Sequence, residues 1–120
     1  MERACGQTWR HAVSLPQILM PRFDVYRLPP EEGDGYLLDV QADILDQLDT
    51  RVVVPLLPPA RAPKLIRELN PILRFGDTEL VLVPQRIATL EMGELGRRIG
   101  TLAGAQDDII RALDLLLTGF

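Results

Sequence analysis

The pattern of residues 106–117 constrains the fold most, because it is the clearest helical period in the chain. Its apolar residues recur at three- and four-residue intervals, which places them along one face of a helix. Asp107 and Asp108 stand where the helix would begin, and carboxylates there meet its exposed N–H groups. Gly119 stands where a left-handed residue commonly ends a helix. The apolar stripe consists of Ile109, Ile110, Leu113, Leu116 and Leu117.

Upstream of this helix, short apolar stretches bounded by turn residues predict β-strands. Residues 23–28 and 36–40 flank a polar turn with two glycines, and residues 72–75 and 79–83 flank Gly76-Asp77. Both arrangements predict hairpins. The stretch 51–57 is apolar on both faces and should be a central strand.

Other segments are less regular. Pro55 within the predicted central strand requires an edge position or a bulge, because proline cannot donate to a strand ladder. Residues 86–92 predict a weaker strand, whereas 41–50 and 64–69 could each be a loop or a single helical turn. The glycines at 93, 96, 100 and 104 predict a flexible approach to the closing helix. Several short strands followed by one helix predict a small barrel or sandwich that carries a terminal helix.

Length and composition indicate one folded domain, with a different N-terminal segment. The chain has 120 residues and 47% apolar residues, enough for a real core. Residues 1–19 contain the only Cys, Trp and His and show no sustained period. We interpret them as an N-terminal extension, disordered or translated from a start codon assigned too early, ahead of a domain at 20–120. The alternative is an arm that inserts Trp9 into a partner.

Charge and cysteine usage exclude several classes of function. The net charge is −4, and from Met20 onward 11 basic residues face 16 acidic ones, a balance of −5, so we expect no direct nucleic-acid binding. No apolar run approaches the roughly 18 residues that a membrane span needs. A single Cys cannot form an internal disulfide, nor a metal site with a single His. These features predict a cytoplasmic protein without a metal or cofactor.

Candidates for catalysis are few. From Met20 onward the chain has no His, Cys or Ser, which removes the commonest bases and nucleophiles. The glycine spacing fits no phosphate-binding motif. Arg97 and Arg98 could serve phosphodiester cleavage, but we interpret them as a solvated pair. Four carboxylates, at Asp39, Asp43, Asp46 and Asp49, would share one helix face, as a cation site or acid–base pair would require. We interpret these four as a solvated acidic loop, and the residues therefore favour binding over catalysis.

Several stretches of the chain resemble the CcdB toxins of bacterial toxin–antitoxin modules. They follow in the same order, almost without gaps, from Met20 to the last residue, and the opening M-P-R-F-D-V-Y is similar as well. The D-V-Q-x-D-I-[IL]-D and N/D-P-[IV]-x-x-x-G-D patterns are specific when they occur together. The stretches are L-D-V-Q-A-D-I-L-D (38–46), R-V-V-V-P-L (51–56), R-E-L-N-P-I-L-R-F-G-D-T-E-L-V-L (67–82) and residues 108–120.

The resemblance implies a mainly β fold, an SH3-like β-barrel with a small extra sheet and a long C-terminal α-helix, assembled as a homodimer. It implies a toxin without enzymatic activity that binds the A subunit of DNA gyrase and traps the enzyme on cleaved DNA. It also implies a cognate CcdA-like antitoxin with a disordered tail. The matching positions for gyrase or antitoxin binding are Ile44, Leu45 and Asp46 in one loop, and Asp114, Leu117, Thr118, Gly119 and Phe120 at the helix end.

The helix end departs from the family's prototype, which ends in Trp-Gly-Ile and inserts the tryptophan into gyrase. Here Thr118 stands at the tryptophan position, followed by Gly119 and Phe120. A buried aromatic anchor contributes about 2 kcal/mol or more to an interface. Threonine offers far less apolar area, and its hydroxyl needs a hydrogen-bond partner, although Phe120 could replace part of the contact.

Three functions stay open on the sequence alone. One is a gyrase poison that uses Leu117 and Phe120 as apolar anchors. The second is a non-toxic or retargeted homologue that acts as antitoxin partner or co-repressor. The third is an mRNA endoribonuclease, since some toxins with a related barrel are such enzymes. The acidic balance and the missing histidine count against the third.

Deletion of residues 1–19 tests the domain boundary. We expect the shortened protein to keep its thermal unfolding midpoint and its binding, because the predicted core residues all follow Met20. A thermal melt of both proteins is the measurement. A large loss of thermal stability would show that the extension is part of the fold.

Overall fold

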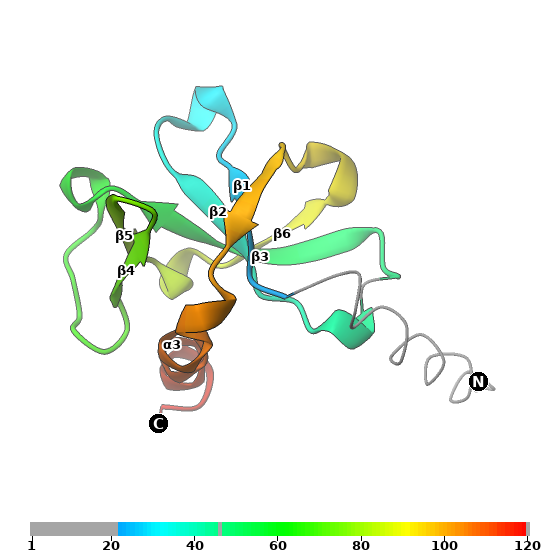
Figure 1. Ribbon diagram of the computed structural model, residues 1–120. Coiled ribbons are helices and arrows are strands. Elements are labelled where there is room, and N and C mark those ends of the chain that lie inside the picture. Colours follow the sequence, from blue (N-terminus) through cyan, green and yellow to red (C-terminus); the bar gives the residue numbers. More distant parts are fainter. Residues whose placement is uncertain (1–21, 46, 120) are drawn as a thin grey trace.

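The structure, a computed structural model, describes residues 22–45 and 47–119. Within these residues, seven antiparallel strands form one curled sheet, a half-barrel, and the α-helix α3 (Gln106–Thr118) lies below it (Figure 1). This architecture confirms the predicted mainly β, SH3-like fold with a C-terminal helix. The predicted extension, residues 1–19, lies outside the described residues. The strands are β1 (Asp24–Arg27), β2 (Tyr36–Asp39), β3 (Thr50–Leu57), β4 (Ile72–Phe75), β5 (Thr78–Leu82), β6 (Ala88–Glu91) and β7 (Arg98–Thr101).

Both predicted hairpins are present. Strands β1 and β2 pair with Val25 opposite Leu38, and β4 and β5 pair with Leu73 opposite Leu80. Gly76, at the turn of the second hairpin, has φ +64°, a left-handed conformation that glycine adopts at little cost. The β4–β5 hairpin lies at one end of this sheet and is joined to the rest of it where β5 pairs with the end of β3.

Strand β3 is central, as predicted, and it pairs along both edges. On one edge it pairs with β2, and on the other edge with β6 first and then with β5. Pro55 lies between these last two partners, where no neighbouring strand requires a donor, and its carbonyl accepts the N–H of Val83 at 3.0 Å. Pro55 is therefore accommodated neither at a sheet edge nor by a bulge, but at the point where the partner of β3 changes from β6 to β5.

The core lies between the sheet and the first turns of α3. Ile109, Ala112 and Leu113 are buried in one cluster with side chains from all of the strands β1 to β5. Burial of each large apolar side chain contributes about 1.5–3 kcal/mol, so this contact holds the helix on the sheet. The buried sheet residues of this cluster are Val25, Leu38, Val54, Leu56, Leu73, Leu80 and Leu82.

The prediction of a flexible glycine-rich approach at 93–104 was wrong for part of that segment. Residues 98–101 form β7, which pairs with β1. Gly100 lies under the ring of Phe75, and a Cβ there would come within 2.6 Å of the ring. Glycine at this position therefore permits a close approach between β7 and the β4–β5 hairpin.

The two ambiguous segments both form turns. Residues 43–45 form a short 3-10 turn, η2 (Asp43–Leu45). Residues 66–70 form a single turn held by Asn70, whose side chain accepts the Ile66 N–H and donates to the Leu82 carbonyl. The predicted strand at 86–92 is confirmed as β6.

Gly100→Ala tests the close approach between β7 and Phe75. The added methyl group would collide with the packed ring, and overpacking of this kind costs about 1–3 kcal/mol of unfolding free energy. Gly104→Ala is the matched control, because nothing lies within 4 Å of its Cβ position. Urea unfolding compares the two, and equal stability would contradict the close approach.

Candidate functional site

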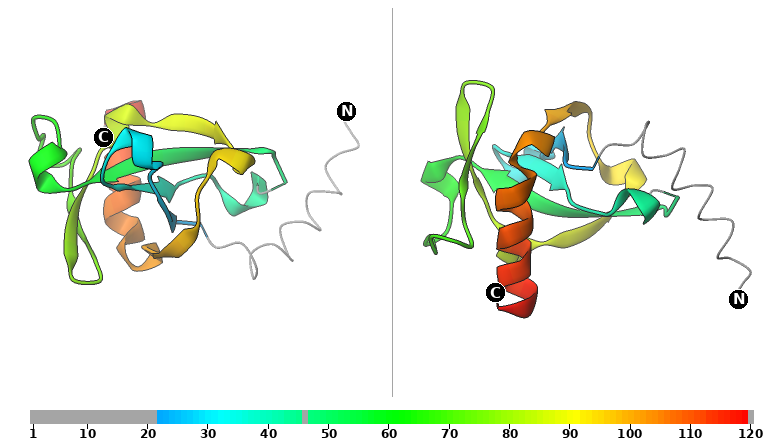
Figure 2. Two further views of the ribbon diagram at one scale, coloured as in Figure 1. Left: turned by 90° about the horizontal axis from the view of Figure 1, so that it is seen from above. Right: turned by 60° about the horizontal axis from the view of Figure 1, so that its bottom comes forward.

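The end of α3 is well formed and stands away from the barrel. Gly119 has φ +83°, and its N–H donates to the carbonyls of Asp114 and Leu115, which ends the helix as predicted. Figure 2 shows the last turns of α3 extending beyond the sheet. Leu117 is 70% exposed, the largest value among the described large apolar side chains. Phe120 lies outside the described residues.

Thr118 satisfies its own hydroxyl. Its Oγ1 donates to the Asp114 carbonyl at 2.6 Å, one turn back along the helix. The hydroxyl therefore needs no partner outside the helix, which removes one of the two disadvantages expected from threonine at this position. The smaller apolar area remains.

The second group of predicted residues lies in and beside η2. Leu45 is 46% exposed, Ile44 is half-buried, and Asp46 lies outside the described residues. Gln41, which the sequence reasoning missed, holds this turn: its side-chain amide donates to the Leu45 carbonyl at 2.8 Å, and its Oε1 accepts the Val52 N–H at 3.1 Å. The predicted loop is therefore anchored to β3.

The two groups are not brought together within one chain. Figures 1 and 2 both show η2 and the end of α3 on separate parts of the surface. Both groups are exposed, but a single continuous face that contains them is not formed by the described residues of one chain.

The acidic residues at 39–49 do not share a helix face. Asp39 ends β2 and is only 4% exposed, so its interpretation as part of a solvated loop was wrong. It pairs with Arg51 at 3.3 Å and accepts the Gln41 N–H at 2.9 Å. Burial raises the pKa of Asp39 above its ordinary value, and that N–H and the Arg51 guanidinium oppose the rise. Among the described residues, no group of three or more His, Cys, Asp and Glu is placed to hold a metal ion.

Arg98 is also not a simply solvated residue. Its Nε lies 2.9 Å from Asp24, a buried carboxylate on β1, and this hydrogen bond raises the pKa of Arg98. The second oxygen of Asp24 is buried without a hydrogen-bond partner among the described residues, so the carboxylate depends on Arg98 for neutralisation. Burial, with Asp24 and Asp39 nearby, raises the pKa of Tyr26 above its ordinary value.

The face of the sheet opposite α3 carries a cleft of about 570 Å³ that is lined by both apolar and charged residues. Sequence reasoning missed this cleft, although alternation along β3 was a signal for it. Val54 and Leu56 point towards α3, so Val53, Pro55 and Leu57 must face the other way. Its apolar lining is Leu28, Pro29, Leu37, Val53, Pro55, Leu57, Ala88 and Leu90, and its charged lining is Glu31, Glu32, Arg86 and Glu94.

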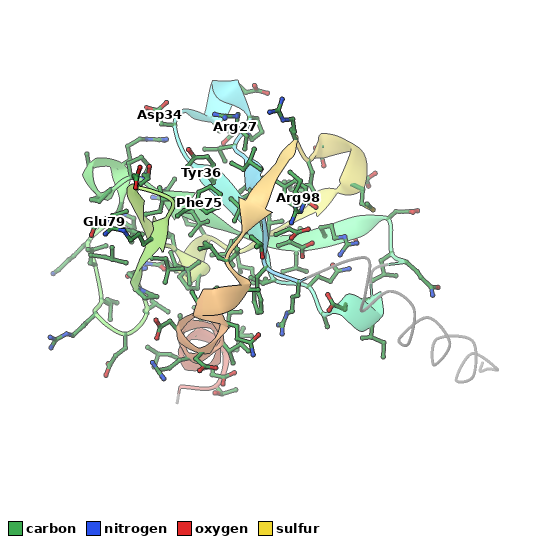
Figure 3. The ribbon with its side chains drawn as sticks, in the orientation of Figure 1. Arg27, Asp34, Tyr36, Phe75, Glu79 and Arg98 are labelled. Atoms are coloured by element: carbon green, nitrogen blue, oxygen red, sulfur yellow. The ribbon has the colours of Figure 1, made fainter. Side chains whose placement is uncertain are left out.

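An aromatic contact lies beside the β1–β2 hairpin, next to a second cleft of about 420 Å³. Figure 3 shows Tyr36 of β2 and Phe75 of β4 side by side, and their ring centroids are 5.8 Å apart. The guanidinium of Arg27 lies 6.0 Å from the centre of the Tyr36 ring. This surface was also not predicted.

Nearly all of the described chain matches one protein family. Residues 22–119 match the model of a family described as "CcdB protein". The chain belongs to the CcdB family.

No helix among the described residues is long and apolar enough to cross a membrane.

The solved structures similar to this CcdB-family chain include proteins described as endoribonucleases. One is an endoribonuclease in complex with its cognate antitoxin from a Mycobacterial species, with a TM-score of 0.66 and 21% identity over 80% of this chain and 92% of that one. Another is an endoribonuclease from a Mycobacterial species, with a TM-score of 0.65 and 21% identity over 80% and 88%. At 21% sequence identity, this likeness shows that the fold is shared and nothing more.

Arg51→Met tests the buried pair with Asp39. Removal of the cation leaves a buried charge, which costs about 3–5 kcal/mol at neutral pH. The loss also raises the Asp39 pKa further, so the native state binds a proton more tightly than the unfolded state does. The loss of unfolding free energy relative to wild type should therefore be largest near neutral pH and shrink as the pH falls through the raised pKa of Asp39. Urea unfolding of variant and wild type at neutral and mildly acidic pH is the measurement.

Arg74→Met is the control for this experiment. Arg74 and Glu79 form a 4.0 Å pair in which both side chains are more than 60% exposed, so its loss should cost less than about 1 kcal/mol at either pH. If the loss of unfolding free energy in Arg51→Met grew as the pH falls, it would contradict the assignment of Arg51 as the partner of a buried, ionised Asp39.

Proposed function

We propose that this chain is the toxin of a toxin–antitoxin module, and that it binds the A subunit of DNA gyrase and traps the enzyme on cleaved DNA. Membership of the CcdB family supports the module. The observation that carries the proposal is the free end of α3, where Leu117 is 70% exposed on a helix whose earlier turns pack one face into the core. An exposed apolar side chain at the tip of a rigid helix is suited to enter a pocket on a partner.

The composition of this tip determines how strongly it should bind. Thr118 takes the place of the family's tryptophan and bonds its hydroxyl to Asp114 within the helix. The apolar contact then falls to Leu117 and Phe120, with Asp114, Gly119 and the Ile44–Leu45–Asp46 loop completing the binding residues. Because Thr118 offers far less apolar area than the family's tryptophan, gyrase binding should be weaker than for a toxin ending in Trp-Gly-Ile.

The proposal includes a cognate CcdA-like antitoxin and a homodimer in the cytoplasm. The solved complex of a similar endoribonuclease with its antitoxin supports an antitoxin partner. A dimer is supported by the geometry of the two groups, because η2 and the end of α3 lie apart in one chain and a second copy could bring them to one face. The acidic balance of the domain suits a basic antitoxin tail.

RNA cleavage is the second candidate function, and the likeness in fold to endoribonucleases favours it. In this chain it would use Arg27 of β1, Arg98 of β7 and Arg97, which directly precedes β7. One of these, Arg98, is already paired with Asp24. Incubation of the purified protein with RNA separates the two functions, because a gyrase poison leaves RNA intact.

Leu117→Ala tests the proposed function. The exposed position should change stability by less than about 0.5 kcal/mol. Binding to the gyrase A protein should weaken about ten-fold or more, because a central anchor is lost. Deletion of Phe120 should act in the same direction. Calorimetric binding, the yield of gyrase–DNA cleavage complexes and growth on induced expression are the measurements.

Arg111→Ala is the control on the same helix. Arg111 is exposed and contacts Asp108 near the other end of α3, so its loss should leave toxicity unchanged. A wild-type protein that neither binds the gyrase A protein nor slows growth would refute gyrase poisoning. Tight antitoxin binding in the same cells would then identify a non-toxic partner or co-repressor.

A further inference from the structure

Gln41 is an amide side chain buried between η2 and β3, and it is only 6% exposed. The residue is not among the positions assigned to target binding. A buried amide is stabilising only when its hydrogen bonds are made, so the partners of Gln41 indicate what it does.

Every described partner of Gln41 connects the loop to the sheet. Its Nε2 donates to the carbonyl of Leu45 at 2.8 Å, and its Oε1 accepts the N–H of Val52 on β3 at 3.1 Å. The Leu45 carbonyl also accepts the N–H of Leu48 at 3.1 Å, so two donors meet at the residue that ends η2.

Asp39 and Arg51 hold Gln41 itself. The Gln41 backbone N–H donates to Asp39 Oδ1 at 2.9 Å, and Asp39 Oδ2 lies 3.3 Å from Arg51. A buried charge pair is costly to form and is often less stabilising than apolar packing would be. If Gln41 positions the loop, the Asp39–Arg51 pair has a function, because Asp39 holds the backbone of Gln41 in place.

Apolar packing cannot position the loop by itself. Leu45 is 46% exposed and Leu48 is 48% exposed, and η2 contains no buried residue. The hydrogen bonds of Gln41 are therefore the described contacts that tie the Leu45 carbonyl to β3.

We propose that Gln41 is a positioning residue, which holds Ile44 and Leu45 in the orientation that the target recognises while making no contact with the target itself. This inference rests on the proposed function, in which the Ile44–Leu45 loop belongs to the gyrase-binding residues. It goes further than the proposed function in one respect: removal of the Gln41 amide should weaken gyrase binding only by displacing the Ile44–Leu45 loop.

Gln41→Met and Gln41→Glu test the proposal in the full chain. Methionine has a similar length and makes neither hydrogen bond, whereas glutamate can accept from Val52 but cannot donate to Leu45. We expect Gln41→Met to weaken binding to a gyrase A fragment by roughly ten-fold, and Gln41→Glu to weaken it in the same direction. Amide hydrogen exchange at Leu45 and Leu48 should accelerate in both.

Gln85→Met is the matched control. Gln85 exchanges hydrogen bonds with Asn70 beside a different turn, so this variant loses comparable bonds while η2 stays intact. Exchange at Leu45 and Leu48 and gyrase binding should remain at wild-type values in this control.

A mutant cycle with the paired truncation Ile44→Ala and Leu45→Ala separates positioning from general stability. If Gln41 acts through the loop, Gln41→Met should change binding less than about two-fold once both of these side chains are already truncated. A full additional loss in that background, or unchanged exchange and binding in Gln41→Met alone, would overturn the proposal. If wild-type protein does not bind gyrase A, the proposed function fails, whereas the exchange at Leu45 still decides whether Gln41 holds the loop.

Discussion

The pairing of β3 along both edges is the constraint on which the rest of the structure depends. Its ladder with β2 leads on to β1 and β7, and its other edge holds β6 and then the β4–β5 hairpin. Strand β3 is apolar on both faces. One face contributes to the core between the sheet and α3, and the other face lines a cleft. A disruption of β3 would therefore affect the core, the cleft and the anchorage of the η2 loop together.

The same core determines which part of α3 is free to bind. The sheet covers Ile109, Ala112 and Leu113 but leaves Leu117 in solvent. One helix therefore has two roles, since its first turns contribute to stability and its last turn is available to a partner. The Thr118 hydroxyl and the Gly119 cap satisfy polar groups at this end, so the tip is ordered without packing against the barrel.

Buried charges connect the barrel to the second group of proposed binding residues. Asp39 and Arg51 form a pair at the end of β2 and the start of β3, next to Gln41. Between β1 and β7, the buried Asp24 pairs with Arg98, whose side chain is half exposed. These pairs stand where short strands join irregular segments, and hydrogen bonds there define the loop geometry that apolar packing leaves open.

The sequence by itself determined the two hairpins, the central strand, and the beginning and end of α3, because periodicity and glycine positions are local signals. It also carried the family resemblance, and with it Leu117 at an exposed helix end. Only the tertiary structure decided that residues 98–101 form a strand, because their pairing with β1 joins segments more than 70 residues apart. For the same reason, only the tertiary structure showed the ion partners of Asp24 and Asp39, the two side-chain hydrogen bonds of Gln41, and the separation of η2 from the helix end. Each of these depends on contacts between distant segments, which local patterns do not encode.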